Sequence, residues 1–124
     1  MRYEKETRPF LRIDTRHNHL IFNRATHDLL GKPTFFMFYW RSDMNALYVA
    51  PQWEEVRHSF AIPPNSLKNR SLEIICQRMY LFSNLRKRMG WKPGCLYKVF
   101  GEYDSAVKMV CFRLEEIQAL EVTV

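Results

Sequence analysis

A run of three consecutive basic side chains lies at the end of one expected helix. Arg86, Lys87 and Arg88 are consecutive within the stretch from Arg78 to Met89. Guanidinium and ammonium groups bind phosphate oxygens, and arginine does so with a planar, bidentate fork. The whole chain has 19 Lys and Arg against 13 Asp and Glu, a formal net charge of +6. These cations predict a polyanionic partner, although cations near a helix C-terminus also stabilise the helix itself, and a solvated basic face is the alternative.

Other reactive side chains form no recognised catalytic or metal-binding pattern. His17 and His19, with His27 and a cysteine, are the nearest approach to a zinc site, but no second pair has ligand spacing. Glu54 and Glu55 lie beside Trp53 without a nucleophile and base in a known motif. The sequence therefore predicts a protein without catalytic residues, metal or cofactor, and hence not an enzyme.

Cysteine spacing and hydropathy predict a cytoplasmic protein. Cys76, Cys95 and Cys111 have no CxxC spacing and cannot all pair, which is typical of buried thiols in a reducing compartment. The apolar run from Phe35 to Trp40 is too short to span a bilayer, and Met1 to Phe10 lacks the layout of a signal peptide. With 47% hydrophobic residues, the 124 residues are expected to form one compact domain with no membrane contact.

The N-terminal elements are expected to be a hairpin followed by a helix. Two extended stretches, Phe10 to Ile13 and His19 to Phe22, are joined by a turn at His17-Asn18, because Asn tolerates left-handed backbone. Asn23 then caps a helix that runs through Leu30 and ends at Gly31. The residues expected to face the core from this helix are Ala25, Leu29 and Leu30.

A second hairpin should follow this helix. Phe35 to Arg41 and Ala46 to Ala50 flank the polar turn Ser42 to Asn45, and the nearly all-apolar first arm predicts a strand covered on both faces. Val56 to Ile62, between prolines, predicts a further strand.

The C-terminal half repeats this order of elements. Arg78 to Met89 is the clearest helix, because Met79, Phe82 and Leu85 recur at helical spacing. The remaining expected elements are a strand at Ser71 to Cys76, a hairpin of Leu96 to Phe100 with Val107 to Leu114 around Gly101 to Ser105, and a last helical turn at Glu115 to Leu120.

A short sequence motif occurs once in each half of the chain. Leu30-Gly31-Lys32-Pro33 precedes the first aromatic strand, and Met89-Gly90-Trp91-Lys92-Pro93-Gly94 precedes the strand that begins after Cys95. A period near sixty residues indicates one small unit that cannot bury its apolar face alone and was duplicated. The expected repeats cover residues 8–51 and 56–120.

The repeated unit resembles the swapped-hairpin unit of AbrB-type transition-state regulators, and its tandem copy is similar to the MraZ-type regulators. The motif Leu-Gly-x-Lys-Pro-Gly-Asp of that family has its counterpart at Met89 to Gly94, with Cys95 in place of the acid. The resemblance implies a mainly β fold with short helices, an α+β pseudo-two-fold swapped-hairpin β-barrel built from two β-β-α-β-β repeats. Closure of such a barrel would remove open edges at Phe35 to Trp40.

The resemblance also implies where DNA would be bound. The family contacts DNA through arginines on the first strand, at a Gly-Arg turn and in the helix before Leu-Gly. Those positions correspond to Arg12 and His19 in the first repeat and to Arg70, Arg86 and Lys87 in the second, which keeps the basic pattern better. All are expected on one basic face. The complete set of expected nucleic-acid contacts is Arg12, Arg16, His19, Lys68, Arg70, Arg78, Arg86, Lys87 and Arg88.

Two function classes follow. The first is a small bacterial DNA-binding transcriptional regulator, of mobile-element or phage origin, which binds double-stranded DNA without catalysis. The alternative is a protein-binding inhibitor or antitoxin-like module, such as a phage-borne anti-defence protein, which the high aromatic content of 15% favours. Either could act as a monomer with pseudo-two-fold symmetry or as a homodimer.

Overall fold

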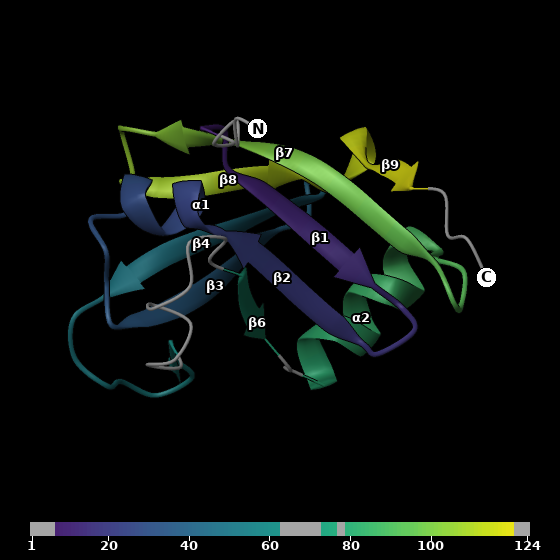
Figure 1. Cartoon of the computed structure of the whole chain (residues 1–124), viewed down its shortest axis with the longest axis horizontal. Helices are drawn as coiled ribbons and strands as arrows, with labels where there is room; N and C mark the ends of the chain where they lie inside the picture. Colours follow the sequence, from purple (N-terminus) through teal and green to yellow (C-terminus); the bar gives the residue numbers. More distant parts are fainter. Residues whose placement is uncertain (1–6, 63–72, 77–78, 121–124) are drawn as a thin grey trace, which may run out of the picture.

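In the part of the chain that the structure describes, one antiparallel sheet curls around a core and is accompanied by two α-helices (Figure 1). The computed structural model describes residues 7–62, 73–76 and 79–120. Within these ranges nine strands pair in the order β5-β3-β4-β8-β7-β1-β2-β6, and β9 pairs with β7. The structure is therefore mainly β with short helices, as the sequence predicts.

The first hairpin and helix are confirmed. Strands β1 (Phe10–Asp14) and β2 (His19–Asn23) pair with Leu11 opposite Phe22, so that inward side chains alternate with outward ones. Helix α1 (Arg24–Leu29) begins at Asn23, whose side chain accepts a hydrogen bond from the Thr26 N–H. The prediction that Leu29 faces the core is wrong, since 42% of it is exposed.

Two polar residues of α1, Thr26 and His27, are buried although they were not among the residues expected to face the core. The Thr26 hydroxyl donates to Asn23 Oδ1 at 2.9 Å, and His27 Nε2 lies 3.0 Å from the Pro33 carbonyl oxygen. These hydrogen bonds offset the cost of burying the two side chains.

The second hairpin is confirmed, but its first arm is not covered on both faces. Strands β3 (Phe35–Arg41) and β4 (Ala46–Gln52) pair around the expected turn. Phe36 is fully buried, whereas Tyr39 is 43% exposed. The expected strand from Val56 to Ile62 is reduced to β5 (Phe60–Ala61), because a turn closed by Ser59 N–H and the Val56 carbonyl occupies its first half.

In the C-terminal half, β6 (Glu73–Cys76) and α2 (Met79–Met89) lie where the sequence predicts them. Strand β7 (Leu96–Asp104) continues through the expected turn, and β8 (Met109–Arg113) follows a later one. The final segment is a 3-10 turn, η2 (Leu114–Glu116), and a strand, β9 (Gln118–Leu120), so only its start is helical.

Gly101 explains why β7 extends further than expected. A Cβ at this position would lie 2.6 Å from the ring of Phe112, which is fully buried. The glycine therefore serves close packing within a strand and does not mark a turn.

All three hairpins described have the same loop. Four residues separate the last paired positions, Asp14 and His19, Arg41 and Ala46, and Asp104 and Met109. The fourth loop residue has positive φ in each case: Asn18 at 58°, Asn45 at 47° and Lys108 at 56°. The polar turn residues thus act through left-handed backbone, as expected for Asn18.

Part of the pairing order, from β5 to β1, reads alike from either half of the chain, whereas β1 pairs with β2 and β5 does not pair with β6 among the described residues. The two hairpins β3–β4 and β7–β8 meet through β4 and β8 at the centre of the sheet. Beyond them β3 pairs with β5, the first strand of the second half, and β7 pairs with β1, the first strand of the first half. Each half therefore places its first strand beside the third strand of the other.

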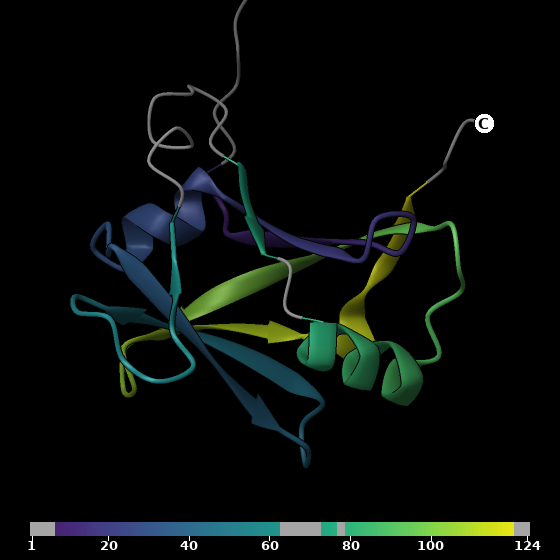
Figure 2. The ribbon, with the colours of Figure 1, turned by 90° about the horizontal axis from the view of Figure 1, so that it is seen from below.

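The sheet is a curled half-barrel and not the closed barrel expected. Figure 2 shows the β3–β4 hairpin projecting beyond the remaining strands. The inner surface of the curled sheet holds one large cluster of buried hydrophobic side chains, which includes Leu11, Phe22, Phe36, Leu47 and Phe112. α2 joins this cluster, so it lies on the inner side of the sheet.

Candidate nucleic-acid interface

The exposed side of α2 carries two of the predicted contacts. Phe82 and Leu85 are buried in the core, which turns Lys87 outward and leaves Arg86 half-buried. Both cations line an open hollow of about 540 Å³ together with Lys92 and Trp91. Lys92 belongs to the repeated Lys-Pro phrase, which could have identified it as a contact.

The β1–β2 loop is fastened to the segment that follows α2. The buried Thr15 hydroxyl donates to the Lys92 carbonyl oxygen at 2.7 Å and accepts from Cys95 N–H at 2.7 Å. Thr15 N–H also donates to the Cys95 carbonyl oxygen at 2.9 Å. The loop that carries Arg16 is therefore fastened to the segment that carries Lys92. We call Arg16, Arg86, Lys87 and Lys92 the basic end.

Asp14 orders the loop that presents Arg16. Its Oδ1 accepts from the Arg16 backbone N–H at 2.9 Å and lies 3.2 Å from Arg16 Nε, while His17 Nδ1 lies 2.9 Å from Oδ2. Burial alone would raise the pKa of Asp14, but hydrogen bonds from His17 and Arg16, with the charge of Arg16, hold it well below its usual range. The carboxylate partly neutralises Arg16.

His19 stacks on His17 at the same loop, with ring centroids 5.7 Å apart. Over the part of the chain that the structure describes, no group of three or more His, Cys, Asp or Glu side chains is placed to hold a metal ion. Because His17 contacts Asp14, the partner of Arg16, the stacked His19 ring lies near the Arg16 loop of the basic end.

The Arg88 side chain points to the β3–β4 loop and not to the hollow lined by Arg86 and Lys87. Its Nε donates to Asn45 Oδ1 at 2.9 Å and its Nη2 to the Ser42 carbonyl oxygen at 3.0 Å, and its guanidinium lies 5.5 Å from the Trp40 ring centroid. Arg88 therefore joins α2 to the β3–β4 loop.

Arg12 lies on the outer face of the sheet, whereas α2 lies on the inner side. Arg12 is opposite Lys98 in the β1–β7 ladder, between the inward side chains of Leu11 and Ile13. The expected single basic face is thus divided into two surfaces. Lys68, Arg70 and Arg78, also expected there, lie outside the described residues.

Cations and aromatic rings meet beside Arg12. Lys98 Nζ lies 4.2 Å from the Phe10 ring centroid, and the Arg8 guanidinium lies 4.0 Å from that of Phe100. Such contacts are attractive and cover the rings. Sequence reasoning missed Arg8 and Lys98, although Lys98 and Phe100 alternate as residues on one face of a strand do.

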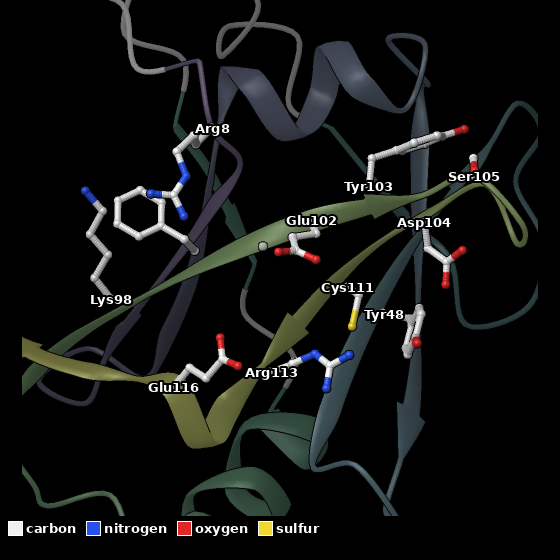
Figure 3. A pocket seen from close by; sticks show the side chains of 12 residues that line it. Arg8, Tyr48, Lys98, Glu102, Tyr103, Asp104, Ser105, Cys111, Arg113 and Glu116 are labelled. Atoms are coloured by element: carbon white, nitrogen blue, oxygen red, sulfur yellow. The ribbon is translucent and has the colours of Figure 1, made fainter.

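A second hollow, of about 560 Å³, lies farther along this outer face (Figure 3). Its cations are Arg8, Lys98 and Arg113, and its carboxylates are Glu102, Asp104 and Glu116. Since the charges balance, the hollow does not favour a polyanion. Within it, a hydrogen bond with the Cys111 thiol raises the pKa of the Tyr48 phenol, and burial adds to this effect.

Comparison of the chain with protein-family models, curated proteins and solved structures finds no match. The helices in residues 7–62, 73–76 and 79–120 are too short and too polar to cross a membrane.

Proposed function

We propose that this protein is a small regulator that binds double-stranded DNA through the basic end and acts without catalysis. The observation that carries the proposal is the double hydrogen bond of Thr15, which fastens the loop of Arg16 to the backbone of the segment that holds Lys92. Lys92 lines the same hollow as Arg86 and Lys87. A fixed arrangement of the backbone segments that carry these cations lowers the entropy lost when the cations contact phosphates.

The pairing order supports an interleaved arrangement of the two halves. β1 of the first half lies beside β7 of the second, and β5 lies beside β3, with β4 and β8 paired between them. We therefore propose that the halves are two β-β-α-β-β units related by a pseudo-two-fold axis.

The charges of the basic end set the expected salt dependence. Each phosphate neutralised on duplex DNA contributes about −0.9 to the slope of log affinity against log salt. If all four cations make contacts, the slope would be about −3.6. The Asp14 carboxylate beside Arg16 reduces that value.

The decisive measurement is the fluorescence anisotropy of a labelled duplex of random sequence, titrated with the protein at several salt concentrations. Arg86→Ala with Lys87→Ala should weaken binding by roughly tenfold or more at low salt and bring the slope to about −1.8. The matched control is Arg57→Ala with Lys108→Asn, which also removes two exposed positive charges. Asn is chosen at position 108 because it tolerates the positive φ there.

Equal losses in the two double variants would assign binding to net charge and would contradict a localised interface. A parent chain that leaves the anisotropy unchanged at low salt would overturn DNA binding altogether. That outcome would favour the protein-binding inhibitor or antitoxin-like module, for which the exposed side chains of Trp53 and Tyr80 are the supporting observation.

A further inference from the structure

One side of β3 has unpaired backbone over most of its length. β4 pairs with all of β3 from Phe35 to Arg41, but β5 pairs only with Phe35 and Phe36 on the other side. In the part of the chain that the structure describes, no strand pairs with that side of Met37 to Arg41. Unpaired edges with apolar side chains and few charges are templates for another strand.

The direction of the free backbone groups follows from the β5 contact. Ile62 N–H donates to the Thr34 carbonyl oxygen at 3.1 Å, so the backbone groups of Thr34 point away from β4. Backbone groups alternate in direction along a strand. The N–H and C=O groups of Phe38 and Trp40 therefore point to the open side, while those of Tyr39 point to β4.

We propose that this edge pairs with the same edge of a second copy of the chain. The two β3 strands lie antiparallel with Tyr39 opposite Tyr39 and Phe38 opposite Trp40. Because Phe38 and Trp40 carry the free backbone groups, each of their pairs exchanges two hydrogen bonds, about four in total. The sheets of the two copies become continuous.

The extent of the edge favours a second copy as its occupant. The open stretch begins where Phe60 of β5 stops pairing, opposite Phe36, and ends at Arg41, where the β3–β4 loop begins. A partner strand of the same length, centred on Tyr39, fills it without meeting β5. The same surface then serves both copies, as a two-fold interface requires.

The side chains of the edge also suit self-association. Phe38 and Trp40 are only half-buried, and a second strand would cover more of them. The one charge in the stretch, Arg41, forms an ion pair with Asp43 at 2.9 Å. Tyr39 would face its own copy at the closely spaced kind of antiparallel pair, about 4.5 Å between Cα atoms, where aromatic side chains attract and like charges repel.

The proposal is tested by sedimentation equilibrium of the full chain without DNA, so its outcome is separate from that of DNA binding. The parent should show a monomer–dimer equilibrium. Tyr39→Lys and Tyr39→Glu should each weaken self-association by roughly tenfold, because each places like charges opposite one another. An equimolar mixture of the two variants should recover dimers, since opposite charges then meet. Tyr80→Lys on α2, where Tyr80 is 90% exposed, is the control and should not change the equilibrium.

Circular dichroism melting of each variant checks that it is folded. If either charged variant unfolds, Tyr39→Thr replaces it, and weaker self-association is again expected. A monomeric parent would overturn the proposal, and is the outcome expected if another part of the chain covers the edge. A dimer that resists all substitutions at Tyr39 would also overturn it, and a mixture that stays monomeric would reject the stated register.

Discussion

The hydroxyl of Thr15 lies 2.7 Å from the carbonyl oxygen of Lys92, across 77 positions of sequence. This hydrogen bond joins the first hairpin to the segment between α2 and β7. It is therefore a contact between the two halves of the chain, and it decides where Arg16 lies relative to the cations of α2.

Replacing Thr15 by Val should destabilise the protein by about 1 to 3 kcal/mol. Val keeps the shape of the side chain but leaves Cys95 N–H and the Lys92 carbonyl without their partner. Urea unfolding followed by Trp fluorescence measures the change. Thr34→Val is the control, because the Thr34 hydroxyl makes one long, exposed contact at 3.4 Å, and a change within about 0.5 kcal/mol is expected. Equal effects at both positions would show that Thr15 has no special role.

Arg88→Gln should lower stability by about 1 kcal/mol and change DNA affinity less than the loss of Arg86 or Lys87 does. The reason is that Arg88 donates to Asn45 and Ser42, which are groups of the protein itself. Unfolding and anisotropy measured on the same preparation separate the two effects. A large loss of affinity with unchanged stability would place Arg88 on the DNA instead.

Gly101→Ala should cost about 1 to 3 kcal/mol, because its Cβ would meet the Phe112 ring at 2.6 Å and the Cys111 carbonyl oxygen at 2.9 Å. The test is a double-mutant cycle with Phe112→Leu, measured by thermal unfolding. Since the smaller side chain removes the closest contact, the combined cost should be less than the sum of the single costs. Additive costs would mean that Phe112 is not the obstacle.

Local signals predicted most elements, because they act through a few neighbouring residues. Asn23 caps α1, Asn18 adopts the left-handed backbone of the first loop, and Gly31 follows the helix with a φ of 83°. Each of these depends on backbone conformation within one turn.

The errors concern what lies across the sheet, which no local pattern contains. Tyr39 is exposed because β3 lies at an open edge, and Gly101 lies within a strand because Phe112 needs its space. Arg12 and Arg86 carry the same charge, yet the sheet separates them, because Arg12 points outward while α2 packs on the inner side. The basic end could be predicted in part from Arg86 and Lys87. That the loop of Arg16 lies against the segment after α2 depends on the hydrogen bonds of Thr15, which no local pattern contains.

The ionised Asp14 carboxylate should stabilise the protein at neutral pH and lose this effect in acid. Because the folded state holds its pKa below that of the unfolded chain, the stabilisation is complete above about pH 4 and falls as the pH drops below that value. Asp14→Asn keeps an acceptor for the Arg16 N–H but removes the negative charge that pairs with Arg16 and lies 2.9 Å from His17 Nδ1. It should cost about 1 to 2 kcal/mol at pH 7 and less as the pH falls toward 2.

Urea unfolding of the parent and Asp14→Asn between pH 2 and 7 measures this difference. Asp104→Asn is the matched control, because Asp104 ends β7 as Asp14 ends β1 and accepts from the Ala106 N–H at 3.0 Å. Its stability difference from the parent should vary less with pH, since its carboxylate is more exposed and the ion pairs of Asp14 are absent from its described contacts. A difference at Asp14 that stayed constant down to pH 2 would show that its hydrogen bonds do not depend on the charge, and that Arg16 is held by the backbone of the loop alone.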